Sequence, residues 1–102
     1  ARLLLPDARA DGVIVAVQVV PGATRLVRVA PDGGTVVPLT TARPDTQWSE
    51  PRWSPDGARI AAVRIAPGAV ASVVVLDTLG VVERVVARTR AVLAAPAWTA
   101  DG

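Results

Sequence analysis

The chain lacks cysteine, histidine, lysine, methionine, phenylalanine and tyrosine, and its only aromatic side chains are three tryptophans. Without cysteine, histidine and lysine, it cannot supply a thiol or imidazole nucleophile, a Schiff-base amine or the usual zinc ligands. It forms no disulfide, and the absence of cysteine fits either redox compartment. Most enzyme mechanisms are therefore excluded within this chain. We expect a protein that is not an enzyme, with no catalytic residue, no metal and no cofactor.

Charge gives little indication of a partner. All eleven cations are arginines, and nine carboxylates reduce the net charge to +2. The arginines are spread along the chain with carboxylates between them and form no basic arm or patch, so we expect no nucleic-acid partner. Apolar runs end within a few residues, well short of the roughly 18 that a membrane span needs. The sequence opens without a leader, so any signal peptide would lie outside it.

An internal repeat at an interval of 45 residues is the most informative feature. Residues 51–57 and 96–102 share proline, tryptophan, aspartate and glycine at the same places, and residues 6–12 share all but the tryptophan. Downstream, with one residue of slippage, residues 17–23 align with residues 63–69. This shared order and spacing predicts a repeated structural unit.

Each repeat is predicted to form four short strands. In the second copy the strands, most of them rich in valine and isoleucine, are expected at residues 49–53, 59–66, 72–77 and 81–87. The intervening turns supply the fixed φ of proline or the positive φ that glycine tolerates. No segment has the apolar spacing of an amphipathic helix, so we predict an all-β fold.

A repeat of this length with four antiparallel strands is typical of a β-propeller blade. Residues 60–63 and 73–76 are apolar on both faces, as expected for a sheet packed between two neighbours. The centre of a β-sandwich is the alternative, but a sandwich does not require the repeat. We predict a β-propeller segment: one blade over 1–45, a second over 46–90, and the first strand of a third over 91–102.

Two and a quarter blades do not close a ring, because propellers have about four to eight blades. Each end blade would leave an apolar face uncovered. We therefore expect a fragment of a longer chain or one protomer of a homo-oligomeric ring, with further blades or another protein as the partner.

Residues 51–61, Pro-Arg-Trp-Ser-Pro-Asp-Gly-Ala-Arg-Ile-Ala, resemble the repeat of the TolB-like propellers. Residues 98–102 are a degenerate copy, and residues 9–12 are a more degenerate one. In that family the string joins the innermost strand of a blade to the second strand. This chain departs from the family at Ala62 and Val63, where an aromatic residue is usual.

The resemblance implies protein contacts in an extracytoplasmic bacterial protein, periplasmic or extracellular and possibly lipid-anchored through a segment not shown. Related propellers occur in LpqB-type lipoproteins. They also form the front domain of prolyl-oligopeptidase-like serine peptidases.

Residues with a recurring position are predicted to be structural. Asp11, Asp56 and Asp101 precede a turn glycine, where a carboxylate accepts hydrogen bonds from its own loop. Calcium binding or acid catalysis is the alternative for them. Trp53 and Trp98 recur at the repeat interval and are expected to pack between blades.

The candidate binding residues do not recur. Residues 41–47 form the longest polar stretch and connect the two blades, and such loops often carry function. We expect them on one face of the molecule with residues 21–24, 67–70 and 87–92. Trp48 is replaced by leucine in the other repeats, so packing in the core is an alternative role for it. For the charged loop residues, the alternative is a solvated surface position without a binding role. The predicted binding residues are Arg43, Asp45, Gln47, Trp48, Arg88 and Arg90.

Three functions remain. The favoured one is a non-catalytic scaffold or protein-binding module. The alternative is an N-terminal propeller gating a serine peptidase whose catalytic domain lies outside this chain, which a Gly-x-Ser-x-Gly string in the continuing chain would favour. A carbohydrate-active enzyme would need two converging carboxylates, but most acids here are assigned to turns.

Overall fold

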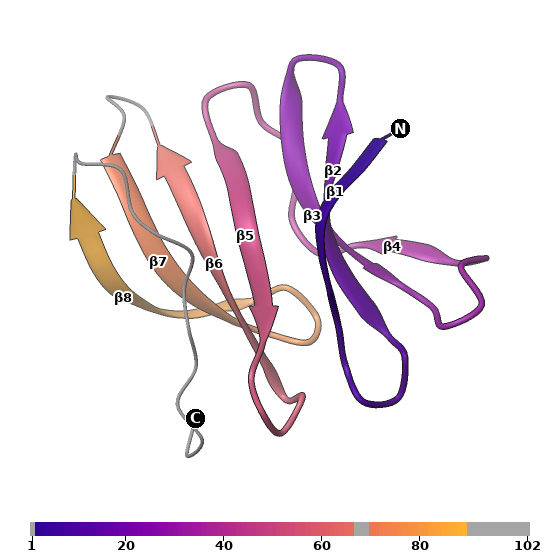
Figure 1. The fold of residues 1–102 in the computed structure, drawn as a ribbon. Helices are drawn as coiled ribbons and strands as arrows, with labels where there is room; N and C mark the ends of the chain where they lie inside the picture. The colour runs from indigo at the N-terminus through magenta and orange to yellow at the C-terminus, as the bar shows by residue number, and fades with distance from the viewer. Residues whose placement is uncertain (1, 67–69, 90–102) are drawn as a thin grey trace.

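The computed structural model describes residues 2–66 and 70–89, which form two four-stranded antiparallel sheets without a helix (Figure 1). The first sheet consists of β1 (Arg2–Ala8), β2 (Ile14–Val20), β3 (Ala23–Val29) and β4 (Val36–Pro38) in sequential order. The second consists, in the same order, of β5 (Gln47–Trp53), β6 (Arg59–Ala66), β7 (Val70–Asp77) and β8 (Val82–Thr89). The predicted all-β fold of two four-stranded units is confirmed. The predicted strand over 91–102 lies outside the described residues.

The strand boundaries differ slightly from the prediction. β6 has the predicted limits, whereas β5 and β7 begin at residues 47 and 70, before the expected starts at 49 and 72. β8 runs over Val82–Thr89, where residues 81–87 were expected. Pairing with β6 extends both neighbouring strands, because Gln47 pairs with Ile65 and Val70 with Ala66. The predicted turn at 67–68 lies outside the described residues.

Each sheet has a β-bulge in its first strand. Leu5 in β1 and Glu50 in β5 have positive φ angles of 53° and 52°, and the strand pairing shifts register beside each. A proline follows both residues, and proline has no N–H to donate to the ladder. The bulge accommodates it by leaving an unpaired residue in the strand. Because the two bulges lie 45 residues apart, the sequence repeat is also a backbone repeat.

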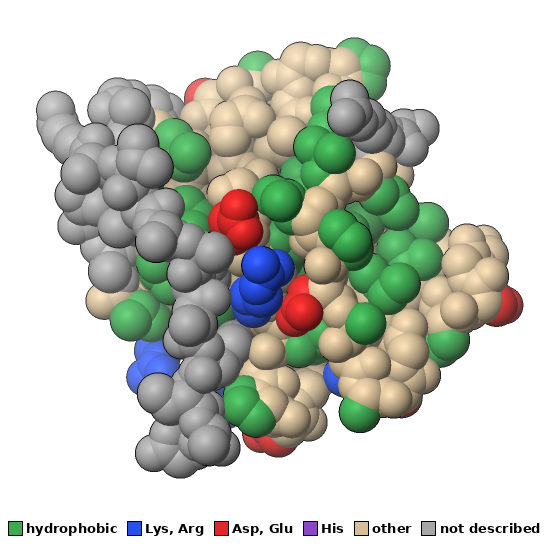
Figure 2. Space-filling view, viewed as in Figure 1, with side chains coloured by type: hydrophobic (Ala, Val, Ile, Leu, Met, Phe, Trp, Pro, Cys, Tyr) green, Lys and Arg blue, Asp and Glu red, His purple; other side chains and the backbone are tan. Residues whose placement is uncertain are grey.

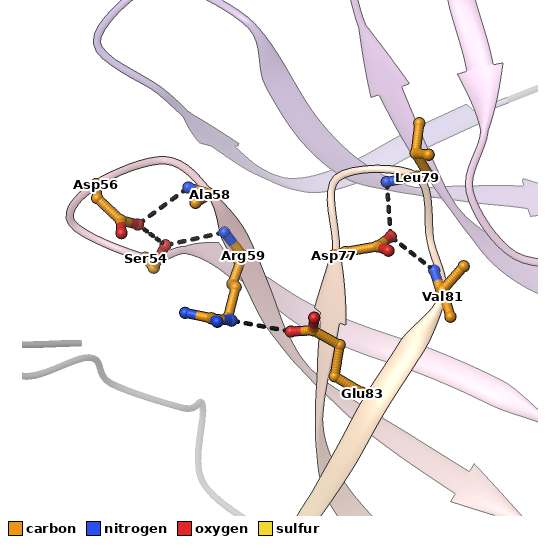
Figure 3. A network of polar contacts seen from close by, with 8 residues as sticks. All are labelled: Ser54, Asp56, Ala58, Arg59, Asp77, Leu79, Val81 and Glu83. Atoms are coloured by element: carbon orange, nitrogen blue, oxygen red, sulfur yellow. Dashed lines mark hydrogen bonds and ion pairs between the residues drawn. The ribbon is translucent and has the colours of Figure 1, made fainter.

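The turn between β5 and β6 is held by its own side chains (Figure 3). The Asp56 carboxylate accepts hydrogen bonds from the Ser54 hydroxyl at 2.6 Å and from the Ala58 N–H at 3.0 Å. The Ser54 oxygen in turn accepts the Arg59 N–H at 3.0 Å. In the first sheet, Asp11 likewise accepts the Val13 N–H at 3.1 Å. The predicted structural role is confirmed for Asp11 and Asp56, and Asp101 lies outside the described residues.

The main hydrophobic core lies between the two sheets. β5 is the strand of the second sheet that contacts β1, β2 and β3. Val15, Val17 and Leu26 of the first sheet pack with residues of the second, among them Trp53 and Ile60. The predicted packing role of Trp53 is confirmed, whereas Trp98 lies outside the described residues.

The two sheets use different faces for this contact. Ile60 and Ala62 of β6 belong to the core between the sheets. The repeat aligns them with Ile14 and Ala16 of β2, yet it is Val15, on the opposite side of β2, that lies in this core. Successive side chains of a strand point to opposite faces. The sheets therefore pack head to tail: the face that the second sheet uses for the contact corresponds, in the repeat, to the face of the first sheet that points away from it.

Head-to-tail packing leaves one face of the first sheet directed away from the second. This face, called the outer face below, is formed by Leu3, Ile14, Ala16, Val27, Val29 and Val36. Figure 2 shows hydrophobic side chains gathered on that side of the first sheet. The Leu3 side chain is 42% exposed. Such exposed aliphatic side chains indicate an interface or a larger structural context.

Candidate functional site

A groove lies where the segment between β4 and β5 passes over the second sheet. Thr40, Thr41, Arg43 and Thr46 of that segment line one side, and residues of the second sheet, including Trp48, Arg64 and Val82, line the other. Its volume is about 490 Å³. It is called the linker groove below. Its volume falls within the range of about 300–1,000 Å³ that is usual for ligand pockets.

The segment between β4 and β5, called the linker below, is held against both sheets. Leu39 is buried and donates its N–H to the Leu26 carbonyl at 2.8 Å, while the Thr40 hydroxyl oxygen accepts the Leu26 N–H at 2.9 Å. On the other side, the β7–β8 turn approaches the linker at Gly80, whose φ is +90°. A Cβ at Gly80 would overlap the Leu39 carbonyl oxygen. Glycine is therefore required for this close approach of the β7–β8 turn to the segment between β4 and β5.

Thr24 joins the end of the linker to the β2–β3 turn. Its hydroxyl accepts the Trp48 N–H at 2.8 Å and donates to the Gln47 side-chain oxygen at 3.1 Å. The predicted proximity of residues 21–24 to the linker is thereby confirmed. The remaining parts of that predicted face, residues 67–70 and 87–92, lie largely outside the described residues.

Trp48 is both a core residue and part of the groove lining. It is 6% exposed and packs in the core between the sheets. The Arg64 guanidinium lies over its ring at 5.9 Å from the centroid, a cation–π contact that holds the arginine at the groove. Of the two possibilities left open by the sequence, core packing is observed, and a contact role for Trp48 stays a prediction.

The charge of the groove is positive. No lining residue carries a carboxylate, and Arg43 and Arg64 form no ion pair within the described part of the chain. The ion pairs that are present join other arginines to acids: Arg9 to Asp11, Arg52 to Glu50, and Arg59 to Glu83. Two guanidinium groups and the hydroxyls of Thr40 and Thr41 thus remain available as hydrogen-bond donors, whereas the Thr46 hydroxyl already donates to Asp45.

The structure brings together some of the predicted binding residues. Arg43 and Trp48 line the groove, and Gln47 lies beside it through Thr24. Asp45 is exposed in the linker turn, where it accepts a hydrogen bond from the Thr46 hydroxyl at 3.2 Å. Arg88 belongs to β8, but its side chain, like the whole of Arg90, lies outside the described residues. Their predicted role therefore stays a prediction.

Arg64 was missed by the sequence reasoning. Its signal is local, because it is the only charged residue in the β6 segment Ile60–Ala66, where neighbouring side chains are apolar. It pairs directly with Trp48 of β5. A cross-strand pairing of this kind could be inferred only once the bulge at Glu50 fixed the register.

A second concave site, of about 330 Å³, lies between the turns of the two sheets. There the Arg9 guanidinium stacks over the Trp53 ring at 4.5 Å and donates to the Gly57 carbonyl at 3.1 Å. Asp7 accepts the Trp53 backbone N–H at 2.8 Å. The buried Trp53 Nε1 has no hydrogen-bond partner in the described structure. These contacts tie the first sheet to the second, so the site is structural.

The turn acids have lowered pKa values. A hydrogen bond from the Arg9 side chain, reinforced by the Val13 N–H, holds the pKa of Asp11 below its usual value of 3.8. For Asp56 the main cause is the Ser54 hydroxyl, followed by the Ala58 N–H, and its pKa is also lowered. Both carboxylates are therefore ionised at neutral pH and act as acceptors, not as general acids.

The described residues contain no group of three or more acidic, histidine or cysteine side chains placed to hold a metal. In the same residues, no helix is long and apolar enough to cross a membrane. No protein-family model, curated protein or solved structure matches the chain.

Proposed function

We propose that this chain is a non-catalytic β-propeller segment of the TolB-like type, acting as a scaffold that binds proteins. The observation that carries the proposal is the head-to-tail packing of the two repeat units. Packing of that kind can continue beyond two units, because the contact made by the first sheet is offered again by the second.

The faces support this continuation. On the second sheet, Ala61, Val63 and Val75 lie on the side turned away from the first sheet and are the repeat counterparts of its inward face. The outer face of the first sheet is the counterpart of the surface that carries Ile60 and Ala62. Another repeat or another copy would thus meet a complementary apolar face at either end, with the gain in free energy that apolar burial provides.

The polar groups support binding instead of catalysis. The described carboxylates accept hydrogen bonds in turns, or form ion pairs, or fix a neighbouring strand as Asp7 does. The linker groove contributes cationic and hydroxyl donors without a partner base. The proposed extracytoplasmic location derives from the resemblance of residues 51–61 to the TolB-like repeat.

Sedimentation velocity on the 102-residue chain at micromolar concentration tests the proposal. We expect self-association, because the outer face is apolar. Leu3→Glu places a charge on this face at a partly exposed site that tolerates it, and the variant should sediment as a monomer. Leu79→Glu makes the same change at a 72% exposed site elsewhere and should leave association unchanged. A stable wild-type monomer would overturn the proposal.

A further inference from the structure

We infer that the linker groove binds a protein segment that combines carboxylate with aliphatic side chains. The inference rests on the proposed role as a protein-binding scaffold and specifies the ligand of one site. It is carried by the unpaired cations of the groove and by the exposed aliphatic side chains beside it.

The cations select a negatively charged ligand. Arg43 is exposed at the rim and makes no side-chain hydrogen bond within the described part of the chain. Arg64 is partly buried over Trp48, so its guanidinium is held in place before a ligand arrives. A pre-positioned guanidinium loses little freedom on binding and offers planar, paired donors that match a carboxylate.

The threonines extend this donor set. Thr41 is exposed and Thr46 is partly buried, and both line the groove beside Arg43. Thr46 donates its hydroxyl to Asp45, so its oxygen can still accept a hydrogen bond, for example from a peptide N–H. The groove therefore offers donors for carboxylates together with an acceptor for a peptide N–H.

The aliphatic side chains distinguish a protein segment from a small anion. Val82 lines the groove, and the turn that precedes it carries Leu79 and Val81, which are 72% and 59% exposed. Gly80, which also lines the groove, lies between them in sequence. A phosphate or a small dicarboxylate would leave this apolar rim in water. A segment with alternating acidic and aliphatic residues would cover both surfaces.

Fluorescence anisotropy of a fluorescein-labelled peptide with alternating glutamate and valine tests the inference on the full chain. We expect saturable binding that weakens as sodium chloride is added. Arg43→Gln and Arg64→Gln should each weaken binding by roughly fivefold or more, because each removes a hydrogen bond between charged groups. Arg84→Gln removes the same charge at an exposed site outside the groove and should change binding by less than about twofold.

Three controls make the outcome decisive. Thermal unfolding of each variant shows whether it is folded. Arg43→Gln changes an exposed side chain and should stay folded, so it tests the inference even if Arg64→Gln unfolds the protein. A glutamine–valine peptide should bind far more weakly, and equal binding would overturn the inference. Binding of inorganic phosphate at millimolar concentration, without binding of the acidic peptide, would identify a small-anion site and overturn it too.

The failure of this inference is distinguishable from failure of the proposed scaffold function. If the acidic peptide does not bind but the chain self-associates, and Leu3→Glu abolishes that self-association, only the inference about the groove is refuted. A monomeric chain that still binds the acidic peptide in an Arg43-dependent way would refute the blade interface alone.

Discussion

The first sheet carries Leu3 and Ala8 at the repeat positions where the second sheet carries Trp48 and Trp53. Both sheets nevertheless have the same strand order and the same bulge before a proline. The backbone of each four-stranded sheet is therefore set by its prolines, turn aspartates and glycines, and the aromatic rings are not needed to form it. The rings occur on the face that is covered, which shows that they serve the contact between sheets.

The largest loss of stability is expected when a tryptophan ring is removed from the second sheet. Trp48→Ala deletes a ring that is 6% exposed and lies in the shared core, and should lower the free energy of unfolding by about 3–5 kcal/mol. Leu3→Ala, at the equivalent but 42% exposed position, should cost less than about 1 kcal/mol. Urea denaturation of both variants measures the two losses.

The same pair of variants also sharpens the proposed assembly. If Leu3→Ala costs as much as Trp48→Ala at high protein concentration but not at low concentration, the outer face is covered by another copy. Equal losses at every concentration would contradict the assignment of Trp48 to a core that Leu3 does not share.

The second largest effect distinguishes backbone strain from steric overlap in two equivalent turns, the β3–β4 turn and the β7–β8 turn. Gly80 and Gly33 both have positive φ and both donate their N–H to the carbonyl three residues before. A Cβ at Gly80 would overlap the Leu39 carbonyl, whereas a Cβ at Gly33 would meet no atom within 4 Å. Gly80→Ala should therefore cost about 3 kcal/mol or more, and Gly33→Ala about 1 kcal/mol from φ alone.

Chemical denaturation of these two variants gives the collision energy as a difference. The 490 Å³ groove supplies a second readout, because a displaced linker would also weaken binding of the acidic peptide in Gly80→Ala. Losses of similar size in the two variants would mean that the linker can shift away from the β7–β8 turn at little cost.

A smaller effect is expected in the turn between β5 and β6. The buried Ser54 hydroxyl donates to Asp56 and accepts the Arg59 N–H, whereas Arg9 occupies the equivalent position in the first sheet. Ser54→Ala leaves that N–H without its acceptor and should lower the free energy of unfolding by about 1–2 kcal/mol. Ser49→Ala makes the same change in β5 at a serine with no side-chain hydrogen bond in the described structure, and should be nearly neutral. Similar melting temperatures for both variants would show that Ser54 is replaceable by water.

The sequence predicted the repeated features of this fold because those features are local. The 45-residue interval, the Asp-Gly turns and the strand β6 follow from residues close together in the chain. The bulges were missed, although Pro6 and Pro51 within their strands signal them, because their effect depends on the partner strand. At the 46-residue offset that aligns residues 17–23 with residues 63–69, Gly34 corresponds to Gly80, but the structure gives the equivalent turn position to Gly33.

The candidate site was predicted only in part. Residues 41–47 were identified by their length and polarity, and Arg43 and Trp48 do line the groove. Residues 21–24 were predicted to lie on the same face, and Thr24 does contact the end of the linker. Arg64, in contrast, comes from β6 and meets the linker only through tertiary packing. A single sequence contains no local signal for such a meeting, since the register that brings Arg64 beside Trp48 depends on the bulge.

The smallest effect concerns the two turn aspartates, whose pKa values are lowered for different reasons. The largest cause is the Arg9 side chain for Asp11 and the Ser54 hydroxyl for Asp56. A lowered pKa in the folded state stabilises the protein above the ordinary value of 3.8, and this contribution is lost as the pH falls through the folded pKa. Melting temperature should therefore decrease below about pH 4, less steeply in Asp56→Asn.

Salt should separate the two turns. Sodium chloride screens the attraction between the half-buried Arg9 and the exposed Asp11, so 0.5 M of the salt should raise the pKa of Asp11 toward its ordinary value. Asp56 depends mainly on hydroxyl and N–H donors, which carry no net charge, and its pKa should move less. Carboxyl carbon chemical shifts followed by NMR at low and high salt measure both values in one titration. Equal salt shifts would mean that the distant charge of Arg59 governs Asp56 as strongly as Arg9 governs Asp11, and that the two turns, despite their different residues, are held by the same electrostatic attraction.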